Sequence, residues 1–199
     1  MKLNLPRLSY LNIGKRAEIF LTEYHSSLSL PIPVEEIAEL KLDLRIIPVK
    51  RLRRDFDIDG CLDSTLTRIF IDFDLYTQQE NRTRFTIAHE IGHLILHQEI
   101  FQKLNIKNEN DLYHLIESMD NEEYSWMEYQ AYSFAGHLLV PKIKLIEEIK
   151  NKVAIGANEN LTEEKLYPLI GDLIKIFNVS GEVLLRRLQK ESLFKNNKP

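Results

Sequence analysis

The feature that most constrains this chain is a pair of histidines, one helical turn apart, inside a long apolar run. The run covers residues 85–97, where His89 and His93 are separated by three residues and Glu90 directly follows the first histidine. Side chains four positions apart on a helix share a face, so two imidazoles there can bind one metal ion. A helix that is apolar almost all round lies at a domain centre, where buried histidines need a polar partner or a metal. The run therefore predicts a central helix that carries a metal site, with Zn2+ as the expected ion.

Length and composition are those of one globular domain of ordinary size. The chain has 199 residues, of which 44% are hydrophobic and 28% charged, which is enough to bury a real core. Because Cys61 is the single cysteine, no internal disulfide can form, and we expect a small apolar filler there and a cytoplasmic location. The lack of a sustained apolar run leads us to expect neither secretion nor membrane insertion. A formal net charge of -4 argues against a surface broadly attractive to nucleic acid.

The region before the metal helix predicts two helices and a small twisted sheet. Apolar spacing indicates a helix over residues 11–24, and Pro33 is expected as the first residue of the next helix. Residues 44–49 predict a strand, and residues 60–62 with 68–72 predict a hairpin. An edge strand of that hairpin, above the metal, is where we expect an extended substrate to add backbone hydrogen bonds.

The middle of the chain contains the metal helix and a second long helix. Asn81 is the expected N-cap of the metal helix, which should run to His97. Residues 98–123 are mixed and polar, and we treat them as an insertion of uncertain shape, helical in part. Further helices are predicted over residues 125–140 and 142–153, with a proline between them.

The C-terminal part predicts a pair of helices joined by a short turn. Thr162 is the expected cap of a short helix, followed by helices over residues 169–177 and 181–193. Two helices around a three-residue turn suggest a helix-turn-helix shape. We therefore expect a metallopeptidase domain over residues 1–153 and a helical appendage, packed on that core, over residues 162–195.

A catalytic zinc usually takes three protein ligands, so the histidine pair needs a third. His97 lies about 12 Å along the helix axis from the first histidine and cannot share its ion. On the helix over residues 125–140, Glu128 shares a stripe with alanines such as Ala131, and Gly92 offers a matching small surface on the metal helix. His137 falls on the opposite side of the same helix. Glu128 is therefore the predicted third ligand.

Two motifs together resemble the ImmA/IrrE family of gluzincin-like metallopeptidases. The first covers residues 84–97 and the second residues 128–141, and the similarity extends over nearly the whole chain. The resemblance implies that His89, His93 and Glu128 bind zinc and that Glu90 serves catalysis. It also implies a substrate class, because several members cleave a helix-turn-helix repressor. The spacer between the two motifs is longer than is usual for the family.

These features predict a zinc-dependent endopeptidase with an α+β, zincin-like fold. Glu90 is assigned as the base that accepts a proton from the attacking water. The donor that stabilises the oxyanion stays open between Tyr129, Tyr132 and His114. The expected partner is a protein substrate, such as a helix-turn-helix repressor, and no membrane.

Three other interpretations remain open on sequence alone. The two histidines can be core imidazoles bonded to backbone groups, with Glu128 on an exposed helix face. A zinc-binding protein without peptidase activity has the same motif. The C-terminal helices can instead belong to a DNA-binding regulator, although residues 181–184, where a recognition helix would read bases, include the acidic Glu182. We expect packing on the core rather than DNA binding.

Overall fold

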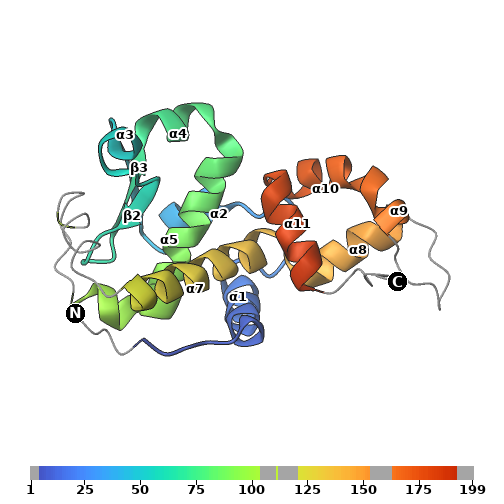
Figure 1. Ribbon diagram of the computed structural model, residues 1–199, viewed down its shortest axis with the longest axis horizontal. Coiled ribbons are helices and arrows are strands. Elements are labelled where there is room, and N and C mark those ends of the chain that lie inside the picture. Colours follow the sequence, from blue (N-terminus) through green and yellow to red (C-terminus); the bar gives the residue numbers. More distant parts are fainter. Residues whose placement is uncertain (1–4, 104–110, 112–120, 153–162, 192–199) are drawn as a thin grey trace.

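The computed structural model describes residues 5–103, 111, 121–152 and 163–191. It is mostly helical, with a small three-stranded sheet at one end (Figure 1), which confirms the predicted α+β class. In the described part of the chain, no helix has the length and apolar character needed to cross a bilayer. The elements in chain order are α1 (Tyr10–Tyr24), α2 (Val34–Glu36), a π-helix (Ile37–Lys41), β1 (Arg45–Val49), α3 (Leu52–Phe56), β2 (Gly60–Leu62), β3 (Arg68–Asp72), α4 (Phe73–Gln78), α5 (Glu80–Phe101), α7 (Asn121–Leu139), α8 (Lys142–Lys152), α9 (Glu163–Leu166), a 3-10 turn (Tyr167–Leu169), α10 (Ile170–Phe177) and α11 (Gly181–Lys190).

The sheet has β3 at its centre and β2 at one edge. The strand order is β1-β3-β2, with β1 parallel to β3 and β2 antiparallel to it. In the hairpin, Cys61 is opposite Phe70 and Leu62 is opposite Ile69. The predicted hairpin is therefore confirmed, and both of its strands, the edge strand β2 and the central strand β3, contact the metal helix α5.

Helices α5 and α7 cross at the centre of the molecule (Figure 1). Their close approach depends on Gly92, because a Cβ atom built there would lie 3.0 Å from the carbonyl oxygen and 3.1 Å from Cα of Ala131. Ala131 and Ala135 are both fully buried. Small residues on both helices thus let the backbones approach, as the sequence predicts, and this crossing sets how far the two helices' side chains lie from each other.

The start and end of the metal helix differ from the prediction. Helix α5 begins at Glu80 after Gln79, so Asn81 is not its N-cap; the Asn81 side chain instead donates to the carbonyl of Val179 at 3.3 Å. The helix also continues to Phe101 beyond the predicted end. His97 has φ -128° and ψ 16°, which is not helical, so the predicted end coincides with a kink.

Several short elements depart from the prediction for local reasons. Pro33 is the N-cap of α2 rather than its first helical residue, and the following turn is a π-helix in which the Leu42 amide donates to the carbonyl of Ile37. Helices α3 and α4 were not expected, because the strand pattern around them masks such short helices. Helix α4 is capped by Asp72, the last residue of β3.

The C-terminal helices α10 and α11 pack on the helical core at the end opposite the sheet (Figure 1). Asn178, in the left-handed region at φ 49°, forms the turn between them. Arg187 on α11 is 3% exposed and donates to the carbonyl of Val140, while Arg84 on α5 donates to the carbonyl of Asn178. The expected boundary between the two domains, the Thr162 cap and much of the 98–123 insertion lie outside the described residues.

Candidate metal centre

The structure brings together the three side chains that the sequence predicts as metal ligands. His89 and His93 project from α5, and Glu128 projects from α7. The two Nε2 atoms are 3.0 Å apart, and the Glu128 carboxylate oxygens lie 3.1 Å from Nε2 of His89 and 3.3 Å from Nε2 of His93. Two imidazoles and one carboxylate thus converge on a single point.

The spacing of these atoms fits one tetrahedral zinc ion. Zinc bonds to nitrogen and oxygen are about 2.0–2.1 Å, so atoms at two corners of a tetrahedron lie about 3.3–3.4 Å apart. The observed separations of 3.0 to 3.3 Å are close to that value, with Oε2 of Glu128 nearer to His89 and Oε1 nearer to His93. Nitrogen and carboxylate donors also suit zinc better than Mg2+ or Ca2+, which prefer oxygen alone. These residues therefore fit the ion that the sequence predicts.

Electrostatics keep this cluster suited to a cation. Burial raises the pKa of the Glu128 carboxyl, but the adjacent histidines outweigh it and the pKa is strongly lowered. Burial likewise disfavours the imidazolium of His89, yet Glu128 and then Glu90 raise its pKa overall. The Glu128 carboxylate is therefore ionised and attracts positive charge, whether a proton or a metal ion.

Glu90 lies beside the cluster but points to the sheet. Its side chain is buried, and its Oε2 accepts a hydrogen bond from the Leu62 amide of β2 at 2.8 Å. Burial raises the pKa of Glu90 in spite of the two neighbouring histidines, which lower it. A carboxylate with a raised pKa, held by one oxygen, is suited to accept a proton on the other.

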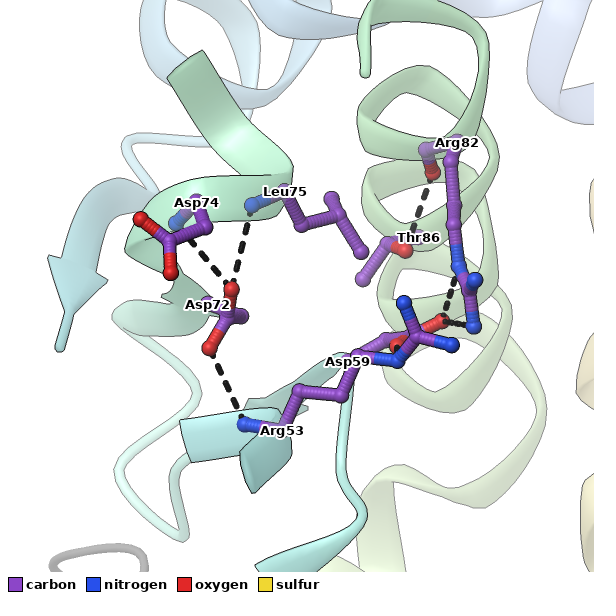
Figure 2. Close-up of polar contacts among 7 residues, drawn as sticks. All are labelled: Arg53, Asp59, Asp72, Asp74, Leu75, Arg82 and Thr86. Carbon is purple, nitrogen blue, oxygen red and sulfur yellow. Dashed lines mark hydrogen bonds and ion pairs between the residues drawn. The ribbon is translucent and has the colours of Figure 1, made fainter. Parts of the chain in front are cut away.

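Two aspartates tie the hairpin to the helices around it, as Figure 2 shows. Asp59, just before β2, pairs with Arg82 of α5 at 2.6 Å and with Arg53 of α3 at 3.4 Å. Asp72 caps α4 and also accepts from the backbone amide of Arg53 at 3.0 Å. Between them Gly60 sits so close to α5 that an added Cβ would lie 2.6 Å from Cγ2 of Thr86. These contacts place Leu62 where its amide meets Glu90.

The cluster opens into a cleft of about 950 Å3. Tyr132, one predicted oxyanion donor, lines this cleft, with its ring centroid 6.1 Å from that of His89. Tyr129 instead stacks on Trp126, and His114 lies outside the described residues. Tyr124 also lines the cleft and was missed, although its position four residues before Glu128 puts it on the same helix face.

The first residues of α11 line the same cleft from the C-terminal side. Ser180, Glu182 and Val183 all face it. Glu182 pairs with Arg186 at 2.8 Å, and the Arg186 guanidinium lies 5.5 Å from the centroid of the Tyr132 ring. The start of α11 is thus part of the wall of the cleft that contains the metal centre.

A histidine pair and a glutamate on a central helix, a carboxylate from a second helix and a small adjoining sheet define the zincin-like class of metallopeptidases. Within that class, the chain matches the IrrE N-terminal-like domain family, Peptidase M78, over residues 61–189, and it belongs to this family. The resemblance to ImmA/IrrE proteins found in the sequence is confirmed. The match includes α5, α7, α10 and α11. No curated protein matches the chain.

Proposed function

We propose that this protein is a zinc-dependent endopeptidase and that His89, His93 and Glu128 hold its zinc ion. Membership of a peptidase family and the convergence of three donor atoms within 4.8 Å of one another support the proposal. The single observation that carries it is the carboxylate of Glu128, brought by α7 to within 3.3 Å of both imidazoles. A cytoplasmic location, expected from the single cysteine, belongs to the same proposal.

Zinc bound there would polarise the scissile carbonyl and increase the acidity of the attacking water. Glu90 then takes the proton from that water on the oxygen that does not bind the Leu62 amide. Its raised pKa favours holding the proton until the leaving amine needs it. Tyr124 is the proposed donor to the oxyanion, because it lines the cleft close to Glu128 and Glu90.

An extended substrate is proposed to lie along the edge strand β2, whose Gly60 and Cys61 line the cleft. The amide of Leu62 already donates to Glu90, so a proline at that position would disturb catalysis as well as substrate pairing. Peptide substrates in which single backbone amides are replaced by esters separate the two effects. Each ester that removes a bond to β2 should raise KM, and equal KM values along the whole series would refute strand pairing.

The proposed substrate is a protein, of which a helix-turn-helix repressor is the expected example. The family resemblance supports this class, and a cleft of about 950 Å3 suits an extended peptide segment. The first residues of α11 line the cleft, which favours a role in contacting substrate over reading DNA. A mobility shift with duplex DNA at low salt would contradict that assignment.

The test of the proposed function is Glu90→Gln with Glu99→Gln as its matched control. Both substitutions remove one carboxylate from α5, but Glu99 is exposed and lies away from the cleft. Glu90→Gln should keep one Zn2+ per chain and lower kcat for a cleaved protein by about 10²-fold or more, while Glu99→Gln keeps the wild-type rate. Cleavage by Glu90→Gln at the wild-type rate would overturn the proposal.

A further inference from the structure

A third histidine on α5 touches the candidate metal centre without being able to join it. The kink at His97 directs its buried ring at His93, with the two Nδ1 atoms 3.1 Å apart. His93 faces Glu128 with its other nitrogen, Nε2. His97 is therefore placed on the outer side of one metal ligand.

Only one direction of hydrogen bonding between these rings is compatible with a metal ligand. Nε2 of His93 must offer its lone pair to the metal, so its hydrogen must be on Nδ1. Nδ1 of His97 then has to accept that hydrogen, which puts the hydrogen of His97 on Nε2. The His97 ring is buried, and a neutral imidazole can accept in this way on its unprotonated nitrogen.

Gln130 of α7 is the group that can receive the remaining hydrogen. It is fully buried, and its Nε2 donates to the carbonyl of Pro6 at 2.9 Å. Because that carbonyl can only accept, the amide orientation is fixed and the oxygen Oε1 is left at the other end. Oε1 of Gln130 and Nε2 of His97 are both buried, and neither has a hydrogen-bond partner among the described residues. The two atoms belong to helices α7 and α5, which pack directly against each other, and the Gln130 side chain lies within interaction range of the His97 ring.

We propose that His97 and Gln130 are positioning residues that hold His93 in the tautomer and orientation required to bind metal. In this chain of hydrogen bonds, called the relay below, Nδ1 of His93 donates to Nδ1 of His97 and Nε2 of His97 donates to Oε1 of Gln130. Nε2 of Gln130 donates in turn to the carbonyl of Pro6. This inference rests on the proposed function, because it assumes that His93 is a zinc ligand. Outer partners of this kind are generally worth about 10–100-fold in metal affinity.

The test measures Zn2+ affinity of the full chain by competition with a chromophoric chelator. His97→Phe removes the acceptor for His93 but keeps a ring, Gln130→Leu removes the acceptor for His97, and His97→Gln keeps an oxygen that can accept. His137→Phe is the matched control, since His137 is a buried histidine of α7 that does not line the cleft and whose Nε2 has no hydrogen-bond partner in the described part of the chain. The first two variants should bind Zn2+ about 10–100-fold more weakly, His97→Gln less so, and the control like wild type.

A second measurement does not depend on how the variants fold. In the Zn2+-loaded wild type, 15N spectra of the histidine side chains should show His97 with its hydrogen on Nε2. A hydrogen on Nδ1 of His97, or unchanged Zn2+ affinity in folded His97→Phe, would overturn the relay alone. Equal weakening by His137→Phe would also overturn it, because the loss would then be one of general packing. A wild-type chain that binds no Zn2+ would refute the proposed function itself.

Discussion

The crossing of α5 and α7 predicts that Gly92→Ala is destabilising, although an alanine normally favours a helix. A Cβ at position 92 would lie 3.0 Å and 3.1 Å from backbone atoms of Ala131 and 3.3 Å from Cβ of Phe134. Contacts this short require the neighbouring atoms to give by a few tenths of an ångström. Backbone atoms of a buried helix cannot rotate away, so α7 itself must shift.

Two opposing effects set the size of the change. Replacing glycine by alanine inside a helix contributes up to about 1 kcal/mol of stability. Overpacking a buried contact costs about 1–3 kcal/mol. The cost at position 92 should lie toward the upper end of this range, because the nearest atoms belong to the backbone of Ala131 and cannot move aside as a side chain can. We expect a net loss of about 1–2 kcal/mol, which lowers Tm by about 2–8 °C in a chain of this size. Because Glu128 is on the displaced helix, Zn2+ affinity should fall as well.

Gly171→Ala provides the control for this prediction. Gly171 is exposed on α10, and a Cβ there would meet no atom of the described residues within 4 Å. Thermal unfolding followed by circular dichroism should show Gly171→Ala at or slightly above the wild-type Tm and Gly92→Ala below it. If Gly92→Ala were as stable as wild type and bound Zn2+ equally well, close packing would not set the geometry of the centre.

Three further predictions concern single side chains. Tyr124→Phe should lower kcat by about 10²-fold with unchanged Zn2+ affinity, because burial and nearby carboxylates raise the pKa of the hydroxyl and keep it protonated; an unaltered kcat in a peptide-hydrolysis assay would exclude the role. Arg187→Met should lower the free energy of unfolding in urea by about 1–3 kcal/mol, because it removes the donor to the buried carbonyl of Val140 and the 2.6 Å partner of Glu191, which keeps Lys142 at 2.8 Å; a loss below about 0.5 kcal/mol would contradict this. Asp63→Asn should lower the free energy of unfolding at pH 7 by about 3 kcal/mol, because it removes a buried charge that is paired with Arg68. Burial raises the pKa of the Asp63 carboxyl, but its hydrogen bonds, including those from Arg68, lower that pKa overall. A carboxyl whose pKa is lowered in the folded state stabilises the protein above its unfolded-state pKa and loses that contribution in acid. The difference in unfolding free energy between wild type and Asp63→Asn should therefore stay constant from pH 7 to about pH 5 and shrink only below about pH 4. A difference that already shrinks near neutral pH would show that the ionised Asp63 is not its source.

The sequence contained enough to place α5 against α7, because that contact depends on residue size along one helical stripe. Glycine at position 92 and alanines at 131 and 135 predict a close crossing, and the crossing brings Glu128 to the histidines. The hairpin was also predictable, because two short apolar runs, residues 60–62 and 68–72, are separated by a short polar segment. Apolar periodicity thus predicted the elements that are held together by burial.

Other features depend on contacts that periodicity does not contain. The kink at His97 turns its ring to His93, and no proline or glycine marks it. Tyr124 was overlooked because the polar residues around it resemble an insertion rather than the first turn of α7. Asp72 caps α4 through a local hydrogen bond from the amide of Asp74, and the amide of Leu62 binds Glu90 through a long-range one. Neither bond leaves a mark on the apolar pattern of the sequence.

The central claim is that one zinc ion is held by two imidazoles of α5 and the carboxylate of Glu128. Anomalous diffraction from crystals of the Zn2+-loaded chain, recorded on both sides of the zinc absorption edge, tests it most directly. The account predicts a single strong peak about 2.0–2.2 Å from Nε2 of His89, Nε2 of His93 and a Glu128 oxygen. A peak elsewhere, or a zinc ion that leaves Glu128 unbound, would contradict it.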